Sequence, residues 1–232
     1  MIFKALKKAF PYTVPVLLGY LVLGIAFGLL LCSQGYPFYI ALLMSVFIYA
    51  GSMQFVAVNL LTGGTTLLGA AAITLSVNAR HLFYGLSMLE KFKGMKKKKP
   101  YMIFALSDET YSLLCGLTPP ENIDRSWFFF FIALLNQCYW VAGTLIGALF
   151  GSLIRINTEG MDFAMTALFV VIFIEQWEKA ENHWPALVGV AVTFLCLLIF
   201  GSENFILFSM AGILITLTLC RKKLEVNAHA DN

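Results

Sequence analysis

Arg80 is the residue of this sequence whose chemistry most needs an explanation. From Ala9 to Val77 the chain contains no aspartate, glutamate, lysine, arginine or histidine, and Arg80 follows shortly after this apolar run. A guanidinium stays charged, and placing it at the centre of a membrane costs about 2.5–3.5 kcal/mol on insertion scales. Arg80 therefore either extends to the membrane surface or faces the protein interior, where a partner or a ligand offsets the cost.

An interior Arg80 would be suited to binding an anion. A guanidinium can hold a carboxylate through two parallel hydrogen bonds, and Asn78 lies two residues before it. His81 can carry a coupling proton because histidine titrates near neutral pH, or it can simply donate to a backbone carbonyl. On a helix Arg80 lies roughly 16 Å before Lys91, about half the thickness of the hydrocarbon layer. Reaching the surface from that depth is strained, so the interior position is favoured.

Asp108 and Glu109 are the carboxylates that we expect near Arg80. Neighbouring residues of a helix point about 100° apart, so only one of the two can face the guanidinium. The other would face water or a cavity and could bind a coupling proton. Alternatively, the pair belongs to a helix cap near the membrane surface. Glu175, close to the end of another apolar segment, is a further candidate for ion pairing or proton coupling and also suits an interfacial position.

Small polar and amide side chains interrupt two further apolar segments. Glycine permits a broken helix, whose free backbone groups can bind both charged ends of a zwitterion. The alternative is ordinary packing, in which these side chains form hydrogen bonds between helices. The candidate substrate-binding or gating residues in these two segments are Gly51, Ser52, Gln54, Asn59, Asn136 and Gln137.

The elements that must position these residues are membrane helices. The chain is 59% hydrophobic and 12% charged, against about 25% charged residues in soluble domains. The composition predicts an all-α, polytopic membrane protein with about six to eight membrane segments in the lipid bilayer. We expect one integral membrane transport domain over residues 1–232, with 221–232 as a cytoplasmic tail. The apolar segments are 11–31, 38–61, 66–89, 101–117, 127–152, 162–177, 184–200 and 204–220.

The basic residues predict how these segments cross the membrane. Clusters of lysine and arginine lie at 4–8, 91–99 and 221–223. Such clusters stay in the cytoplasm, so the N-terminus should be cytoplasmic and an even number of crossings should separate the first two clusters. We therefore expect 38–61 to be broken or re-entrant around its central glycine. By the same reasoning, 101–117 should cross outward and 127–152 should return inward, which places Arg155 in the cytoplasm. The segment 162–177 should then not cross the membrane.

An internal similarity suggests two repeat halves, 9–99 and 100–220. At an offset of 123 residues, Tyr20, Gly24 and Gly28 correspond to Gly143, Gly147 and Gly151. On the predicted topology the two copies enter from opposite sides, as in secondary transporters built from inverted repeats. The alternative is that glycines four residues apart simply allow helices to pack closely.

Several classes of function are excluded by what the sequence lacks. It has no nucleophile with a base nearby, no glycine-rich phosphate loop and no zinc-protease spacing. Its five cysteines form no CxxC pair and fit small apolar filler. We therefore expect no enzyme activity, no cofactor, no metal and no nucleic-acid partner.

Three motifs carry a resemblance to a known family. They are 47–55 (FIYAGSMQF), 78–85 (NARHLFYG) and 107–111 (SDETY), extended by 140–151 and 161–164. With these motifs the chain resembles the AzlC family of bacterial branched-chain amino-acid permeases. The resemblance implies an inner-membrane exporter of leucine, isoleucine, valine and related amino acids. It also implies a small AzlD-type membrane subunit as partner.

The resulting expectation is export by alternating access, driven by a proton or ion gradient. Arg80 with Asn78 would orient the substrate carboxylate or anchor a gate, Asp108 or Glu109 would pair with Arg80 or take the proton, and 51–54 would form the floor of the site. Two alternatives stay open. A channel-like pore would transport without saturation, and a non-transport assembly or sensor subunit would not protect cells against valine-rich dipeptides.

Overall fold

The computed structural model describes residues 2–153 and 182–228, together with single residues between 163 and 180. Every regular element in these ranges is helical, as the composition predicts. The chain divides into two compact units, which we describe separately. One comprises Met1–Thr65 and Val77–Met165, and the other comprises Thr66–Ser76 and Thr166–Asn232. The candidate site residues that the structure describes all lie in the first unit.

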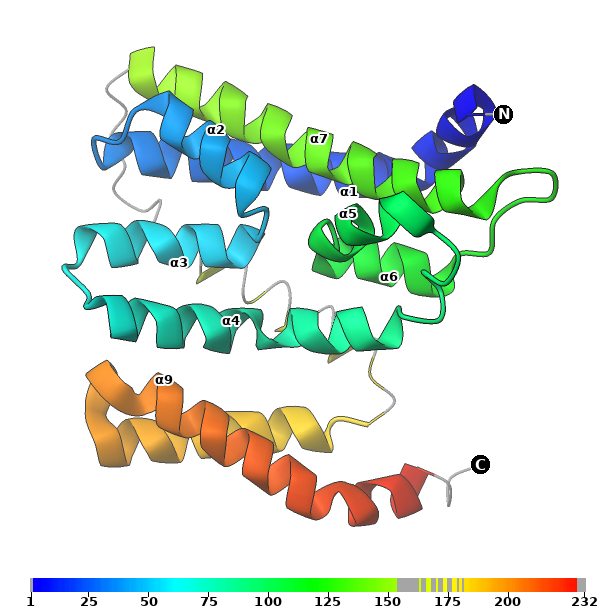
Figure 1. Ribbon diagram of the computed structural model, residues 1–232. Coiled ribbons are helices and arrows are strands. Elements are labelled where there is room, and N and C mark those ends of the chain that lie inside the picture. The colour runs from blue at the N-terminus through cyan, green and yellow to red at the C-terminus, as the bar shows by residue number, and fades with distance from the viewer. Residues whose placement is uncertain are drawn as a thin grey trace. The chain divides into compact units, whose positions relative to one another are not determined.

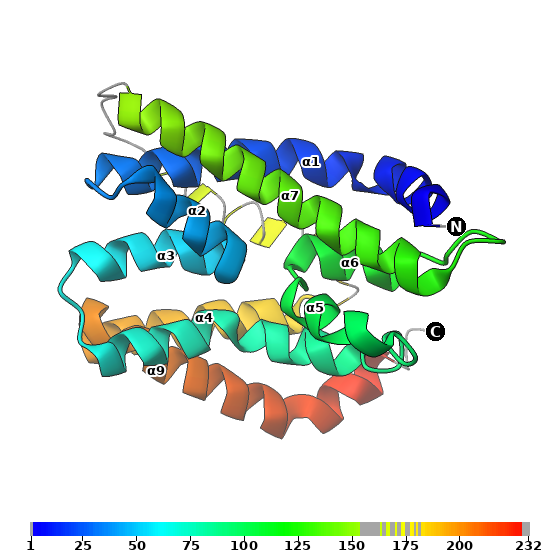
Figure 2. The ribbon, with the colours of Figure 1, turned by 45° about the horizontal axis from the view of Figure 1, so that its top comes forward.

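Two long helices, α1 (Ile2–Ser33) and α7 (Arg125–Leu153), pack side by side in the first unit (Figures 1 and 2). Glycines form their contact. A Cβ atom at Gly24 would lie 2.9 Å from the Thr144 backbone nitrogen, and one at Gly143 would lie 2.9 Å from the Leu21 carbonyl oxygen. The backbones therefore touch, as closely packed membrane helices do when glycines line their contact. Because residue numbers rise together along the contact, α1 and α7 run parallel.

The parallel arrangement corrects two expectations. Copies related by an inverted repeat would run antiparallel, so α1 and α7 are not inverted copies, and packing explains their matching glycines. The segment 127–152 also does not return to the side where α1 starts, because α7 begins beside the start of α1, where the Tyr12 and Phe128 rings lie 5.7 Å apart. The division into halves 9–99 and 100–220 stays a prediction.

The segment 38–61 is broken, as predicted. Helix α2 (Phe38–Phe47) has 10 residues and α3 (Gly51–Thr62) has 12, so each is about 15–18 Å long, roughly half the hydrocarbon thickness. At the break Tyr49 adopts a φ of 45°, which a residue with a side chain rarely does. The Tyr36 hydroxyl donates to the Leu61 carbonyl at 3.4 Å, which joins the two outer ends. The pair forms a helical hairpin, and its re-entry into the membrane stays a prediction.

The segment 101–117 was predicted to cross the membrane, and the structure contradicts this. After α4 (Leu67–Ser87) and a turn containing η1 (Lys96–Lys98), the chain forms α5 (Lys99–Phe104) and α6 (Asp108–Gly116). These helices have 6 and 9 residues, too few for a crossing.

Helices α5 and α6 form a second hairpin. The Lys91 ammonium, which precedes α5, donates to the carbonyls of Leu114 and, at 2.7 Å, Cys115 at the end of α6. Lys98 contacts the start of α7, with its ammonium 3.5 Å from the centre of the Trp127 ring. Helix α2 instead approaches the later part of α7, where Ser45 donates to Thr144 at 2.9 Å. The two hairpins therefore enter from opposite ends of α7.

The first two basic clusters lie at one end of the first unit. Helix α1 starts with Lys4, Lys7 and Lys8, and the turn that carries Lys98 contacts the start of the parallel helix α7. Burial lowers the pKa of Lys98, and the carboxylate of Asp124 opposes this effect. This arrangement agrees with the expectation that both clusters lie on one side of the membrane, and the number of crossings between them stays a prediction.

In the second unit, α9 (Trp184–Ala228) folds back on itself at Gly201, whose φ of 71° and ψ of 174° interrupt the helix. The Phe200 and Phe208 rings stack at 4.1 Å across the bend, which matches the predicted segments 184–200 and 204–220. In the described ranges, three helices are long and apolar enough to cross a membrane: Ile2–Ser33, Arg125–Leu153 and Trp184–Gly201. Arg155 and most of 162–177, including Glu175, lie outside the described residues.

Candidate functional site

The breaks of the two hairpins lie close together. The Tyr49 and Phe104 rings, one at each break, have centres 6.3 Å apart. Both breaks share a short pattern, an aromatic residue followed by alanine, any residue and serine, at 49–52 and 104–107. Helix α3 begins within its copy of the pattern, and helix α6 begins directly after its copy. The N-termini of both helices therefore lie in the same region. Such N-termini carry partial positive charge.

Arg80 of α4 joins the two hairpins. One guanidinium nitrogen, Nη1, lies 2.9 Å from Asp108 Oδ2 in the first turn of α6. Nη2 donates to Ser52 Oγ in the first turn of α3. The Arg80 and Asp108 side chains are only 27% and 19% exposed. Arg80 thus faces the protein interior, and of its two expected partners Asp108 is the one in contact.

This ion pair leaves hydrogen-bonding capacity unused. Among the residues that the structure describes, Arg80 Nε and Asp108 Oδ1 are buried and have no hydrogen-bond partner. A buried polar group left unpaired costs about 1–3 kcal/mol, so a ligand that satisfied both atoms would gain binding energy. Arg80 Nε is a hydrogen-bond donor within a cation, and Asp108 Oδ1 is a hydrogen-bond acceptor on an anion. Their chemistry suits a molecule that carries a carboxylate and an ammonium.

The N-termini of α3 and α6 differ in charge. Helix α6 is capped by Ser107, whose Oγ accepts from the Thr110 backbone nitrogen at 3.2 Å, and its first turn contains two carboxylates. The cap that the sequence offered as an alternative is therefore present, at a helix break. Helix α3 has no side-chain cap and no acidic residue in its first turn. Beside Arg80, the start of α3 is the more favourable place for an anion.

Glu109 points away from the ion pair. The Tyr20 hydroxyl of α1 donates to Glu109 Oε2 at 2.6 Å and also lies 2.6 Å from Ser107 Oγ. The Tyr20 ring is buried against Trp140 of α7, with ring centres 5.4 Å apart. As expected for neighbouring helical residues, Asp108 and Glu109 serve different partners.

Asn136 and Gln137 connect α7 to both hairpins. Gln137 Nε2 donates to the Val46 carbonyl at 3.0 Å, and its Oε1 accepts from the Tyr101 hydroxyl at 2.7 Å. Asn136 Nδ2 donates to Thr110 Oγ1 at 2.9 Å. These are the interhelical hydrogen bonds that the sequence offered as the alternative to substrate binding.

Gln54 has a similar position on α3. Its Nε2 donates to Ser45 Oγ at 3.1 Å, and its Oε1 accepts from Trp140 Nε1 at 2.8 Å. The side chain is fully buried. Gly51 lies beside the same tryptophan, since a Cβ atom there would be 3.1 Å from Trp140 Cη2. Gln54 therefore faces α7, whereas its neighbour Ser52 faces Arg80.

Three predicted residues do not join Arg80. Asn59 is exposed on the later part of α3. Asn78 lies two residues before Arg80, which is about 200° around a helix, and its Oδ1 is buried without a partner. The His81 ring packs edge-on against Tyr84 at 5.7 Å. Asn78 therefore lies on a different side of α4 from Arg80, and the joint role of the two residues stays a prediction.

Sequence reasoning missed two tyrosines of this region as site residues. Tyr20 binds the Glu109 carboxyl, and Tyr49 is 5% exposed, with its hydroxyl buried near Tyr20 and Ser107. The pattern shared by 49–52 and 104–107 is a signal that could have indicated Tyr49. Tyr20 lies in a long apolar helix and offers only its hydroxyl as a signal.

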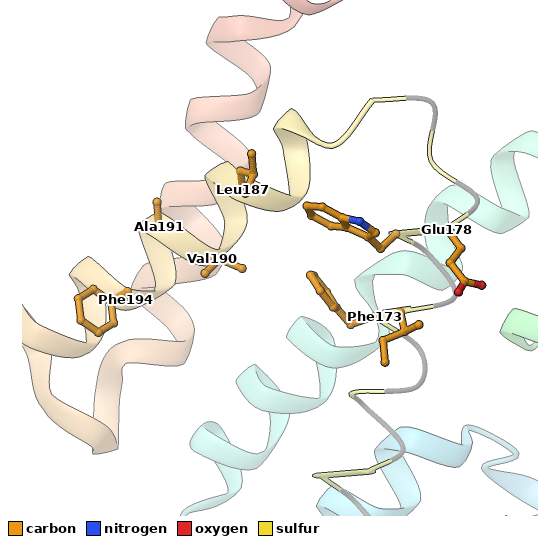
Figure 3. Close-up of a pocket in the computed structure, with 8 residues that line it drawn as sticks. Phe173, Glu178, Leu187, Val190, Ala191 and Phe194 are labelled. Atoms are coloured by element: carbon orange, nitrogen blue, oxygen red, sulfur yellow. The ribbon is translucent and has the colours of Figure 1, made fainter.

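An apolar groove of about 660 Å³ lies in the second unit (Figure 3). Its lining includes Phe173, Glu178, Leu187, Val190, Ala191 and Phe194. None of the predicted site residues that the structure describes contributes to it. In the part of the chain that the structure describes, no three histidine, cysteine, aspartate or glutamate side chains are arranged to hold a metal ion.

Comparison with known proteins gives the family. Residues 15–154 match the model of the AzlC protein family. The chain is 50% identical to the branched-chain amino acid transport protein AzlC of Bacillus subtilis, over 97% of this chain and 88% of that protein. It is 46% identical to an uncharacterized membrane protein of Helicobacter pylori, over 96% of this chain and 97% of that protein.

A more distant relative is the inner membrane protein YgaZ of Escherichia coli, 27% identical over 73% of this chain and 72% of that protein. No solved structure matches the chain. The family model covers more than half of the chain, and the Bacillus subtilis protein is matched over nearly its whole length. On these grounds the chain belongs to the AzlC family of membrane transport proteins.

Proposed function

We propose that this protein exports branched-chain amino acids across the inner membrane by alternating access, driven by an ion gradient. The observation that carries the proposal is the Arg80–Asp108 ion pair, which retains one free donor and one free acceptor at the junction of two broken hairpins. The name of the Bacillus subtilis relative, a branched-chain amino acid transport protein, supports this substrate class.

The substrate would bind through both of its charged groups. Its carboxylate would accept from Arg80 Nε and lie near the uncapped N-terminus of α3, and its ammonium would donate to Asp108 Oδ1. A zwitterion in this position adds no net charge to the membrane interior. Gly51 and Ser52, at the start of α3, would form the floor of the site.

Arg80 would also act as a gate. Its guanidinium holds α3 and α6 together, and these helices belong to hairpins that enter from opposite ends of α7. A substrate carboxylate would compete with Ser52 and Asp108 for the same guanidinium. Binding would therefore loosen the link between the hairpins, and either hairpin could then move to open the site to one side.

Two further parts of the proposal rest on the family resemblance and on charge. A small AzlD-type membrane subunit would be the partner. The end of the first unit that carries Lys4, Lys7, Lys8 and the 91–99 cluster would face the cytoplasm, because basic residues are retained there.

Efflux of labelled valine from loaded vesicles tests the proposal. The vesicles are compared with and without a proton gradient and with and without the small subunit. We expect saturable efflux that Arg80→Lys reduces about tenfold or more, since lysine lacks the guanidinium fork. Efflux that rises linearly with valine would indicate a pore. Deletion of the protein without any gain in sensitivity to valine-rich dipeptides would indicate a role other than transport.

A further inference from the structure

We propose that Glu109 is the proton-binding group that couples transport to a proton gradient, and that Tyr20 positions its carboxyl group; this rests on the proposed transport function. The adjacent carboxyl groups of α6 have separate partners. Asp108 pairs with Arg80 at 2.9 Å, whereas Glu109 accepts from the Tyr20 hydroxyl at 2.6 Å. In the described residues Glu109 forms no ion pair, so its charge lacks a direct counterion.

Among the described residues, the groups that face Glu109 include no cation other than Arg80. From α1 comes Tyr20, from the break before α3 comes the phenol of Tyr49, and from α4 comes Arg80, whose guanidinium contacts Asp108 and Ser52. Asp108, the neighbour on α6, adds negative charge. A buried carboxylate without a cation is costly, and binding a proton removes that cost. Of the two acidic residues, Glu109 is therefore the one suited to gain and lose a proton.

The Tyr20 hydroxyl can follow both states of the carboxyl group. It lies 2.6 Å from Glu109 Oε2 and 2.6 Å from Ser107 Oγ. When Glu109 is ionised, Tyr20 donates to the carboxylate. When Glu109 is protonated, its hydroxyl donates to the Tyr20 oxygen and Tyr20 donates to Ser107 instead. The hydrogen bond between Glu109 and Tyr20 is kept in both states, and the proton leaves to water when the site opens to the other side.

Glu109 is placed to respond to the substrate. It follows Asp108 directly in α6, and Asp108 is the acceptor proposed for the substrate ammonium. A substrate that draws Arg80 and Asp108 to itself changes the charge beside Glu109, so the occupancy of the site and the proton on Glu109 depend on each other.

The test separates exchange from gradient-driven transport. Purified full-length protein, with the small subunit if wild type requires it, is reconstituted into vesicles. Valine counterflow at equal pH on both sides measures binding and the movement of the loaded carrier. Valine accumulation driven by a pH gradient, applied in either direction, measures the coupling of valine transport to protons. Wild type should show both activities. Glu109→Gln should keep wild-type counterflow and fail to accumulate valine, whereas Asp108→Asn should lose both.

Tyr20→Phe is the second variant, in case Glu109→Gln does not fold. It should keep counterflow and shift the pH dependence of accumulation, and thermal unfolding in detergent serves as the folding control. Accumulation by Glu109→Gln at the wild-type level, a folded Glu109→Gln without counterflow, or a wild type indifferent to the pH gradient would each overturn the inference. Absence of valine counterflow in wild type would instead overturn the proposed function.

Discussion

At the scale of single residues, Arg80 matters because one guanidinium contacts two groups and keeps a further donor for a third. It contacts Asp108 and Ser52, and its Nε remains free for a ligand. Removing one partner of a buried ion pair leaves an uncompensated charge, which costs about 3–5 kcal/mol, whereas removing both charges can be nearly neutral. Stability and transport should therefore respond differently to changes in this pair.

The first prediction compares single and double substitutions of the pair. Arg80→Gln should destabilise the protein by several kcal/mol, and Arg80→Gln with Asp108→Asn should restore most of that loss. Both variants should be inactive, because neither retains the charges that bind a zwitterion. Thermal unfolding in detergent and valine counterflow measure the two properties. A double variant that transports valine normally would rule out the proposed role of the pair.

The second prediction concerns the buried amide of Gln54. Gln54→Leu would leave Trp140 Nε1 and Ser45 Oγ without this partner, at a cost of about 1–3 kcal/mol. Asn59→Leu is the matched control on the same helix, because Asn59 is exposed and should tolerate the change. The midpoint of thermal unfolding gives the comparison. Equal stability of both variants would show that the Gln54 hydrogen bonds contribute little.

The sequence allowed the interior position of Arg80 and its contact with one of Asp108 and Glu109 to be predicted, because an isolated charge in an apolar stretch demands a partner; it did not indicate which of the two. It did not allow Tyr20 to be paired with Glu109, or Asn78 to be placed away from Arg80. Both depend on how α1, α4 and α6 are rotated about their axes, which only the packed structure determines.

At the scale of elements, glycines fix how closely α1 and α7 approach. A Cβ atom at Gly147 would clash with the carbonyl of Ile25, so Gly147→Ala should destabilise the protein by about 1–3 kcal/mol. Gly19→Ala on α1 is the control, because a Cβ atom there meets nothing within 4 Å. It should be stabilising by about 0.5–1 kcal/mol, as expected for a helix interior. Thermal unfolding measures both, and a harmless Gly147→Ala would contradict the packing.

Of the two helix breaks, only the first was predictable as a break. It contains Gly51 and several polar residues, which are typical of irregular backbone. The second falls at 105–107, where alanine and leucine precede serine and no glycine or proline occurs. Its one signal is Ser107, an N-cap residue before two carboxylates. An apolar break of this kind is stabilised by tertiary contacts, such as that of Asn136 with Thr110, that a single segment does not reveal.

At the scale of the whole molecule, a re-entrant arrangement of the two hairpins predicts which loops share a side of the membrane. In a cysteine-free background, single cysteines at Gln34 and Thr65 flank the first hairpin, and those at Lys97 and Glu121 flank the second; all four residues are exposed. An impermeant maleimide should label the first two in intact spheroplasts and the second two only after permeabilisation. Labelling of Gln34→Cys and Thr65→Cys from opposite sides would show that α2 and α3 together cross the membrane.

The proposed transport mechanism depends on the recognition of both charges of an amino acid at the Arg80–Asp108 pair. Counterflow of labelled valine, in competition with unlabelled analogues, tests this most directly. Leucine and isoleucine should compete as well as valine, whereas valinamide, which lacks the carboxylate, and isovalerate, which lacks the ammonium, should compete about tenfold to a hundredfold less. Competition by valinamide and isovalerate equal to that of valine would contradict the proposed recognition of both charges at this pair.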